Sequence, residues 1–282
     1  MKNIFVVPNP NKDVGYKVTS LVCKYLLSFD ADLTMPQKYR DCGLGVTFAN
    51  ECPPGCELVI VIGGDGSFID ASQYAIRNDL PIIGINMGKV GYLSEVLPDD
   101  ITILRKIFTD EFKIEKKLLL TATVISDAKT TVIDRLAVND VVVSHTDYLG
   151  IADFVIYSND GGVRYRADGV VISTPAGSTA YSLSSGGPIV SHRADAMIVT
   201  PIAPHSFFNR SIVFGSKEVI RVKNTGRDNL NITVDGRLVA TLHPGDKCVI
   251  RAADKPLRVL TFKENNMFAN LFGKMQIMED VI

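Results

Sequence analysis

The sequence has little net charge, since its 282 residues include 30 lysines and arginines against 31 aspartates and glutamates. Because charges of both signs are scattered along the chain, no broad electrostatic field favours nucleic acid or an anionic membrane as a partner. Long hydrophobic runs are missing as well. The apolar stretch 4–7 ends at Pro8, and it is too short for the core of a signal peptide or for a membrane-spanning helix. We therefore expect a cytoplasmic protein whose partners are small molecules.

Paired cysteine motifs are also absent. The five cysteines are an odd number spread from Cys23 to Cys248 without Cys-x-x-Cys spacing, so neither a disulfide framework nor a zinc ribbon is indicated. Cys52 and Cys56 flank a Pro-Pro-Gly turn that allows the two thiols to lie close together, but no histidine accompanies them. The four histidines are separated in the sequence and form no metal-ligand pattern. Metal ligands stay unassigned.

The first hundred residues alternate strand-like and helix-like segments. Apolar runs predict three buried strands and helical spacing predicts three helices: strands 4–7, 58–62 and 81–86, and helices 12–29, 67–77 and 99–108. Asp99 or Asp100 is the expected N-cap of the last helix. This alternation is typical of βαβ units and a parallel, Rossmann-like sheet, so residues 1–110 are predicted to form an α/β domain.

From about Phe112 onward, β-branched residues alternate with polar ones, which is typical of a mainly β domain. Seven strands are predicted: 118–125, 135–144, 153–158, 170–173, 218–222, 230–234 and 247–251. Asn159 to Gly162 predicts a hairpin turn. We assign the mainly β domain to 111–252, which leaves the C-terminal segment 253–282 free to pack back on the N-terminal domain. The fold is expected to be α+β overall.

The most informative motif is Gly63-Gly64-Asp65-Gly66, which directly follows the apolar strand 58–62. A buried strand that ends in glycines and one carboxylate offers backbone amides and a base at the carboxyl end of a sheet, where open α/β folds bind ligands. This arrangement suits phosphate chemistry. The alternative is an ordinary tight Asp-Gly turn, and three further Asp-Gly pairs in the chain make the motif a weak indication by itself.

A second and more specific motif is the block from Ile172 to Val190, rich in Ser, Thr and Gly. Its strand ends at Pro175, Gly177 permits backbone conformations that other residues resist, and a helix is predicted to start at Ser178 and Thr179 and to run through about Ser185. The block therefore offers many hydrogen-bond donors in one place. A polar turn with a well-capped helix is the purely structural alternative.

With these motifs the chain resembles the NAD kinase family. Six matching segments occur in the family's order and span roughly residues 60 to 240: 63–68, 86–93, 139–140, 168–190, 201–206 and 234–236. The resemblance implies a transferase that moves a phosphoryl group from ATP, or in some members polyphosphate, to the 2′-hydroxyl of the adenosine ribose of NAD, which gives NADP. It also implies a homodimer or homotetramer.

The chemistry of the residues agrees with this resemblance. Phosphoryl transfer to an alcohol needs a carboxylate near the attacking hydroxyl, amides near the phosphates and a divalent cation, here expected to be Mg²⁺. Asp65 is the candidate catalytic base, and Gly63, Gly64 and Gly66 allow phosphates to approach the backbone. No Walker A sequence is present, because the stretch 84–89 has the wrong spacing and lacks the following Ser or Thr. The phosphates must be held in another way.

The resemblance also assigns binding roles and places the dinucleotide between the two domains. Asn139 and Asp140, expected to follow a strand over 135–138, would hydrogen-bond NAD. Asp168 would meet the nicotinamide end of NAD bound mainly to a neighbouring subunit. Four residues would line the adenine and ribose pocket: Thr179, Ala180, Tyr181 and Ser184. The remaining binding candidates are Tyr92, Arg166, Ala176, Ala203 and Asp235.

Three residues depart from the family pattern, and one of them, Ala176, replaces a frequent Thr without an expected consequence for the mechanism. Asp140 stands where many members have Glu, and Asp70 stands where members often carry a basic residue that faces the donor phosphates. Two other classes of function are the alternatives: a related kinase with the same glycine motif acting on a lipid or sugar alcohol, and a non-catalytic regulator that binds a dinucleotide. The block 174–188 together with Asn139-Asp140 favours the NAD kinase over the first alternative, and Asp65 favours it over the second.

Overall fold

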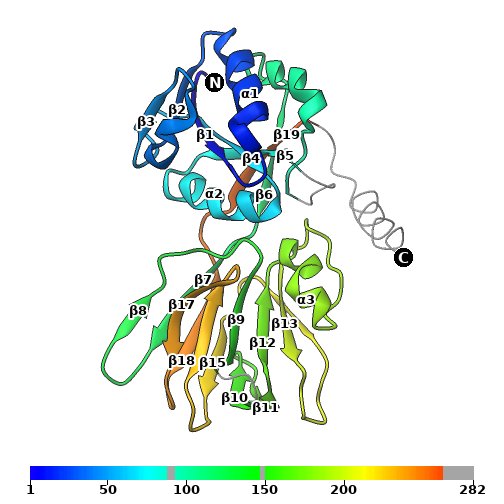
Figure 1. Cartoon of the computed structure of the whole chain (residues 1–282). Coiled ribbons are helices and arrows are strands. Elements are labelled where there is room, and N and C mark those ends of the chain that lie inside the picture. The colour runs from blue at the N-terminus through cyan, green and yellow to red at the C-terminus, as the bar shows by residue number, and fades with distance from the viewer. Residues whose placement is uncertain (88–92, 147–149, 263–282) are drawn as a thin grey trace, which may run out of the picture. The chain divides into compact units, whose positions relative to one another are not determined.

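The computed structural model describes residues 1–87, 93–146 and 150–262 (Figure 1). Tyr92, one of the binding candidates, lies outside these residues. The chain divides into two compact units, and among the described residues the first combines Met1–Lys116 with Leu257–Phe262. The second unit is Lys117–Pro256. The domain limits expected from the sequence, after residues 110 and 252, fall a few positions before these divisions.

The first unit is built on a seven-stranded sheet in the order β3-β2-β1-β4-β5-β19-β6. Its strands are β1 (Asn3–Pro8), β2 (Asp32–Pro36), β3 (Thr47–Ala49), β4 (Leu58–Gly63), β5 (Pro81–Asn86), β6 (Lys113–Lys117) and β19 (Leu257–Thr261). Each neighbouring pair from β3 to β19 is parallel. All residues of β4 and β5 are buried, as expected for strands that helices cover on both faces. The predicted parallel sheet is confirmed.

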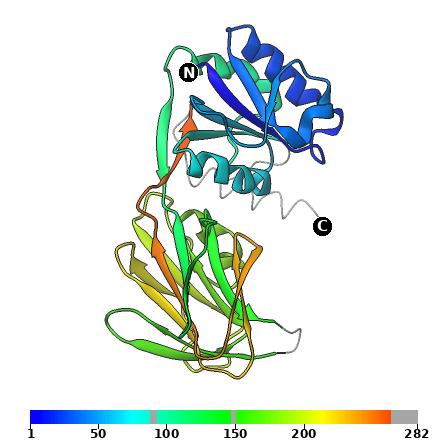
Figure 2. The ribbon, with the colours of Figure 1, turned by 90° about the vertical axis from the view of Figure 1, so that its left-hand side faces the viewer.

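Helical segments cover both faces of this sheet (Figure 2). They are η1 (Val14–Tyr16), α1 (Lys17–Leu27), η2 (Gln37–Cys42), α2 (Asp65–Arg77) and η3 (Pro98–Ile107), where η marks a 3₁₀ helix. Ile4 and Val6 of β1 share a core cluster with residues of α1 and η3. The intervening Phe5 points to the opposite face, where its ring lies 5.1 Å from that of Tyr74 in α2. The alternation of side chains along β1 thus serves two helical layers.

Two helix predictions need correction. The helix expected over 12–29 starts only at Lys17, because Gly15 (φ 72°) and Tyr16 (φ 54°) adopt left-handed backbone conformations. The segment predicted as 99–108 is a 3₁₀ helix whose N-cap is Leu97, so neither Asp99 nor Asp100 caps it. Pro98 favours the first helical position because its ring fixes φ, and both aspartates therefore fall inside the first turn.

The second unit contains two antiparallel six-stranded sheets, ordered β11-β10-β15-β18-β7-β8 and β14-β13-β12-β9-β16-β17. The strands of the first sheet are β7 (Leu120–Ile125), β8 (Thr130–Val132), β10 (Ala152–Tyr157), β11 (Gly162–Ala167), β15 (Ile220–Asn224) and β18 (Lys247–Ala252). Those of the second are β9 (Asp140–His145), β12 (Gly169–Ser173), β13 (Ala196–Ile202), β14 (Ile212–Gly215), β16 (Leu230–Val234) and β17 (Arg237–Leu242). The predicted mainly β character is confirmed.

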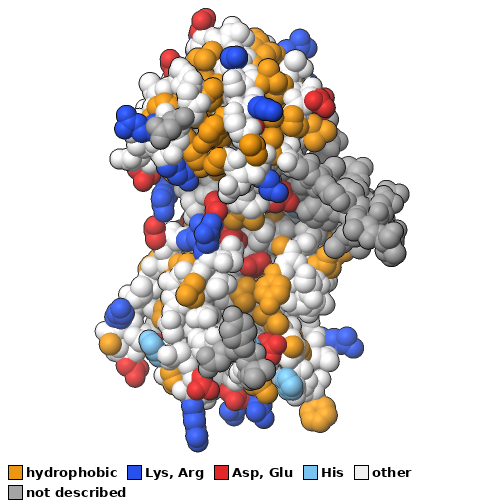
Figure 3. Space-filling model, in the orientation of Figure 1, with side chains coloured by type: hydrophobic (Ala, Val, Ile, Leu, Met, Phe, Trp, Pro, Cys, Tyr) orange, Lys and Arg blue, Asp and Glu red, His pale blue; other side chains and the backbone are white. Residues whose placement is uncertain are grey.

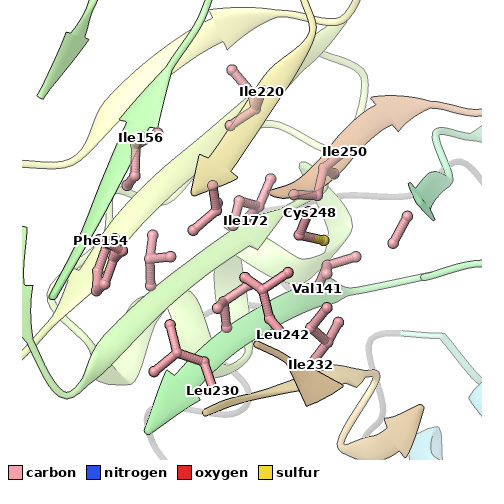
Figure 4. Packing of buried hydrophobic residues seen from close by; sticks show 14 of the residues in the cluster. Val141, Phe154, Ile156, Ile172, Ile220, Leu230, Ile232, Leu242, Cys248 and Ile250 are labelled. Atoms are coloured by element: carbon pink, nitrogen blue, oxygen red, sulfur yellow. The ribbon is translucent and has the colours of Figure 1, made fainter. Parts of the chain in front are cut away.

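Side chains from both sheets form one core cluster in this unit (Figure 4). Phe154 and Ile156 come from β10 of the first sheet, and Val141, Ile172 and Ile232 come from the second sheet. Alternate residues of β10 are buried, as the period of two in a half-buried strand requires. The unit is therefore a β-sandwich.

The predicted hairpin turn is confirmed, since Gly161 has a φ of 134° and its carbonyl accepts a hydrogen bond of 3.0 Å from the Ser158 amide. Acidic and basic side chains are interspersed on the face shown in Figure 3. None of the helices in the described ranges has the length and hydrophobicity that crossing a membrane requires.

Candidate active site

The glycine motif lies where the winding of the first sheet reverses. β1 and β4 are neighbours, β2 and β3 extend the sheet on one side of them, and β5 extends it on the other. Asn9, directly after β1, is bonded to the first turn of the helix that follows β4, since its Nδ2 donates to Oγ of Ser67 at 2.6 Å. In open α/β sheets this crevice at the switch point is the usual ligand site.

Asp65 is the first residue of α2 and comes directly after the N-cap, Gly64. It is half-buried, and its Oδ1 accepts a hydrogen bond of 3.2 Å from the Leu93 amide. This bond ties the carboxylate to the chain that follows β5. A carboxylate held in this way, at the carboxyl end of a buried strand, has the chemistry of a general base for a hydroxyl group.

The three glycines of the motif differ in what surrounds them. A Cβ on Gly63 would lie 3.2 Å from Cβ of Asn9 and still closer to the Ser67 side chain, so close packing requires glycine there. A Cβ on Gly64 or Gly66 would meet no atom within 4 Å. Gly64 has an ordinary φ of −98°, so neither packing nor backbone conformation requires glycine at this position. Bare backbone at 64 and 66 leaves room for a ligand beside the first amides of α2.

Asp70, which departs from the family pattern, is exposed on α2. It is one of the charged groups that act on Lys38. A cation therefore stands near this position although residue 70 itself is acidic.

In the second unit, Asn139 and Asp140 lie at the start of β9. The sequence placed them after a strand over 135–138, and this expectation is wrong. Ala137 forms only an isolated bridge with Leu120, and the regular ladder begins at Asp140. The physical reason is the Asp235 carboxylate, which accepts the amides of Val138, Asn139 and Asp140 at 2.9, 2.8 and 3.2 Å and so replaces strand pairing there.

Thr174 holds the same peptide segment from the other side. Its amide donates to the Asn139 carbonyl at 2.8 Å, and its hydroxyl donates to the Val138 carbonyl at 2.7 Å. The hydroxyl also accepts the Gly177 amide at 3.0 Å. The first residues of the Ser/Thr-rich block are thus bonded to the Asn139-Asp140 pair, and the structure brings these two motifs together.

Asp235 is close enough to Asp140 to influence its protonation. Burial, and then the negative charge of Asp235, raise the pKa of Asp140 to about 7. Burial also raises the pKa of Asp235, while the three amide hydrogen bonds and the positive charge of Arg135 act in the opposite direction. Near neutral pH Asp140 therefore binds and releases a proton.

The helix predicted from Ser178 to Ser185 is instead two short pieces, η4 (Ala176–Thr179) and α3 (Tyr181–Ser184). The break falls at Ala180, whose φ of −102° and ψ of −128° are not helical. Ser178 anchors the block, since its hydroxyl lies 2.7 Å from the Pro175 carbonyl and accepts the Val190 amide at 3.1 Å. The binding candidates form the outer part of the block: Ala176, Thr179 and Ala180 are half-buried, and Tyr181 and Ser184 are exposed.

Arg166, Asp168 and Ala203 form a separate group. The Asp168 amide donates to the carbonyl of Ile202 at 3.0 Å, and Ala203 follows with a left-handed φ of 43°. Nε of Arg166 lies 3.6 Å from Oδ1 of Asp153. This group sits at the start of β12, whereas Asp140 pairs with Ser173 at its end. At about 3.3 Å per residue, the two ends of this strand are separated by roughly 13 Å.

Within the described part of the chain, no group of three or more His, Cys, Asp or Glu residues has the arrangement of a metal site. Mg²⁺ in kinases is commonly held by one or two carboxylates together with substrate phosphates, without a dedicated protein cage. Asp65 is the carboxylate at the glycine loop and fits that chemistry. All five cysteines are free thiols.

Sequence reasoning missed two contributors. Asn9 follows the apolar strand 4–7, and the position of an amide side chain after a buried strand was the available signal. Thr174 belongs to the block already identified, but its contact with Val138 and Asn139 joins segments that lie far apart in the sequence.

A doubly wound α/β unit with a carboxylate in a glycine loop, joined to a β-sandwich, defines a nucleotide-binding phosphotransferase. The sequence matches the ATP-NAD kinase N-terminal domain over residues 4–112 and the ATP-NAD kinase C-terminal domain over residues 138–262. The chain therefore belongs to the NAD kinase family.

Named relatives agree with this assignment. The chain is 34% identical over 284 residues to the NAD kinase of Thermoanaerobacter sp. (strain X514), which covers 98% of this chain and 99% of that one. It is 38% identical over 231 residues to the NAD kinase of Magnetococcus marinus, with coverages of 80% and 76%. The kinases for lipid or sugar alcohols and the non-catalytic regulator are thus set aside.

Two solved structures share the fold. Yeast NADH kinase complexed with NADH has a TM-score of 0.88 at 20% identity and covers 98% of this chain and 88% of its own. An NAD kinase from Archaeoglobus fulgidus in complex with ATP has a TM-score of 0.74 at 24% identity, with coverages of 97% and 98%. At these identities the likeness shows the fold.

Proposed function

We propose that the protein transfers the terminal phosphoryl group of ATP to the 2′-hydroxyl of the adenosine ribose of NAD and so produces NADP. The observation that carries this proposal is the position of Asp65, a carboxylate anchored at the switch point of the sheet beside two glycines with open space around them. The two relatives described above are named NAD kinases, and the bound ligands of the two similar structures are NADH and ATP.

Asp65 acts as the general base in this proposal. Its carboxylate accepts the proton of the 2′-hydroxyl while the hydroxyl oxygen forms a bond to the terminal phosphorus and the bond to the leaving ADP breaks. Charge on the phosphate oxygens increases during transfer, and backbone amides at Gly64 and Gly66 stabilise it. Asp65, together with the phosphate oxygens of ATP, would hold Mg²⁺, which would offset the charge of the phosphates.

The second unit binds the acceptor. Asn139 and Asp140 hydrogen-bond the ribose, since a carboxylate accepts paired hydroxyl groups well. Four residues from the outer part of the Ser/Thr-rich block line the adenine and ribose pocket: Thr179, Ala180, Tyr181 and Ser184. Ala176 lies in the same part of the block. The hydrogen bonds of Thr174 and Asp235 support this assignment, because they fix the backbone from which the Asn139 and Asp140 side chains project.

We also propose that the protein is a cytoplasmic homo-oligomer. Arg166, Asp168 and Ala203 lie at the opposite end of β12 from Asp140. This separation supports the role implied by the family, in which Asp168 meets the nicotinamide end of NAD bound to a neighbouring subunit. Phe207, which follows in the same loop, is fully exposed and supports an interface there. The free thiols fit a reducing compartment.

The direct test is a coupled assay with purified protein, NAD, ATP and Mg²⁺, in which an NADP-specific dehydrogenase detects the product. Parallel reactions replace ATP with polyphosphate, or NAD with NADH. We expect NADP with ATP and NAD, and no signal when the divalent ion is removed with a chelator. Product only with polyphosphate, or only with NADH as the acceptor, would overturn the assigned donor or acceptor. No product with any donor would overturn the proposed reaction.

A further inference from the structure

Two acidic residues lie next to each other in the second unit, Asp140 at the start of β9 and Asp235 in the turn that follows β16. Val141 of β9 pairs with Val234 of β16, and the residues next to them, Asp140 and Asp235, are joined by two hydrogen bonds. The Asp235 amide donates to the Asp140 carbonyl at 3.0 Å, and the Asp140 amide donates to Oδ1 of Asp235 at 3.2 Å. Two negative charges held close together and away from water destabilise the folded state. A local feature that opposes folding is a candidate for function.

The two carboxyl groups have very different partners. Both oxygens of Asp235 accept backbone amides, three in total, from Val138, Asn139 and Asp140. Asp140 is only 5% exposed, yet none of residues 1–87, 93–146 and 150–262 donates a hydrogen bond to its carboxyl group. The acceptor capacity of Asp235 is thus used within the protein, whereas the described residues leave that of Asp140 unused.

On the basis of the acceptor role assigned above, we propose that Asp235 is a positioning residue for the acceptor site and that Asp140 exchanges its proton for hydrogen bonds from the acceptor's ribose hydroxyls. In this exchange the protonated carboxyl group of Asp140 releases its proton to solvent. The carboxylate that results accepts O–H groups of the ribose. No covalent bond to the ligand forms, and one proton leaves for each acceptor bound.

The charged groups around the pair favour this exchange. Asp235 faces Asp140 from the end of β16, and Arg135, on the segment before β9, acts on Asp235. On the β12 side the neighbours are Ser173 and Thr174, which carry no charge. With Asp235 as the opposing charge, the buried Asp140 holds a proton in the free protein near neutral pH. Hydroxyl donors stabilise the ionised form, so ligand binding releases this proton.

Isothermal titration of NAD into the full-length protein tests the inference without any phosphoryl transfer. Titrations at pH 6 and pH 8.5, each in two buffers that differ in ionisation enthalpy, give the number of protons released. We expect close to one proton at pH 6 and close to none at pH 8.5, with affinity roughly tenfold weaker at pH 6. Binding at pH 6 without proton release would overturn the inference.

Three variants locate the effect. Asp140→Asn is expected to bind NAD without proton release at either pH. Asp235→Asn removes the opposing charge and part of the amide acceptor, so proton release should move to lower pH and affinity should fall roughly tenfold. Asp228→Asn, at an exposed aspartate of the same unit, is the matched control and should behave as the wild type. Wild-type proton release in Asp140→Asn would contradict the assignment.

A carboxyl ¹³C NMR titration of the free protein examines the pair without a ligand. We expect the carboxyl signal of one aspartate to titrate near neutral pH in the wild type and at lower pH in Asp235→Asn. This titrating signal should be missing in Asp140→Asn. If Asp235→Asn does not fold, the wild type and Asp140→Asn still decide the question. If NAD does not bind at any pH, the proposed acceptor site is wrong. If NAD binds but no aspartate titrates near neutral pH, only the proposed proton release is wrong.

Discussion

Gly177 lies against the backbone of Asn139, so closely that a Cβ at residue 177 would be 2.7 Å from Cα of Asn139 and nearer still to its carbonyl group. Only glycine allows the Ser/Thr-rich block to approach the Asn139-Asp140 pair in this way. The contact joins two motifs that are separated by almost forty residues in the sequence, and it places both in one candidate binding site.

Gly177→Ala is therefore expected to displace Asn139. Overpacking of this kind typically costs about 1–3 kcal/mol, and KM for NAD should rise while KM for ATP stays nearly constant. Gly215→Ala is the matched control in the same unit, because a Cβ there would meet no atom within 4 Å. Thermal denaturation and steady-state kinetics measure the two effects. An unchanged KM for NAD would contradict the role of this contact.

Two glycines of the first motif are expected to have different roles, Gly63 in packing and Gly66 in phosphate binding. Gly66→Ala is expected to keep or raise stability, since alanine favours a helix by about 0.5–1 kcal/mol, but to lower kcat/KM for ATP because its methyl group occupies phosphate space. Gly63→Ala should instead lower the melting temperature, because its Cβ would meet Asn9 and Ser67. Equal ATP kinetics in Gly66→Ala and the wild type would argue against phosphate binding at this loop.

Asp65→Asn is expected to retain the fold and NAD binding while turnover falls by about two to four orders of magnitude, the usual contribution of a general base. Single-turnover kinetics and NAD titration separate the two effects. Asp99→Asn, at an exposed aspartate of the same unit, is the control and should leave both unchanged. Wild-type turnover in Asp65→Asn would exclude the carboxylate as the base.

Asp140→Asn should change the pH dependence of stability. The pKa of Asp140 rises from 3.8 to about 7 in the folded protein, so between these values the folded state holds a proton that the unfolded chain has lost. The free energy of unfolding therefore falls as pH increases through this window. At pH 8 the variant should be more stable than the wild type by at most about 4 kcal/mol, and at pH 4 the two should be nearly equal. Denaturant titrations at both pH values measure the difference in the free energy of unfolding between the variant and the wild type. The same difference at pH 4 and pH 8 would contradict the raised pKa of Asp140.

Phe207→Asp is expected to weaken self-association, because a fully exposed aromatic ring is replaced by a charge in the loop after β13. Sedimentation velocity gives the oligomeric state. Val132→Asp, at another exposed apolar residue on β8, is the comparison and should keep the wild-type assembly. A wild-type protein that sediments as a monomer while fully active would rule out the proposed homo-oligomer.

Several elements were predictable because local patterns specify them. The apolar run at 81–86 has the same limits as β5, and the strand 58–62 extends by only one residue into the glycine motif. The predictions failed where distant groups compete with local preference. The composition of 135–138 predicts a strand, but the carboxylate of Asp235, about a hundred residues later, accepts the amides of Val138 and Asn139. Ala180 interrupts a segment that composition alone assigns to one helix.

The sequence by itself determined the class of each domain, the family and the carboxylate of the glycine motif, because periodicity and short motifs are properties of neighbouring residues. Only the tertiary structure decided that Asn9 supports the glycine loop, that Thr174 and Asp235 hold Asn139 and Asp140 from two sides, and that Asp168 lies at the other end of β12. These relations depend on strand order and register, which join residues far apart in the chain, and they set which polar groups are left open to a ligand.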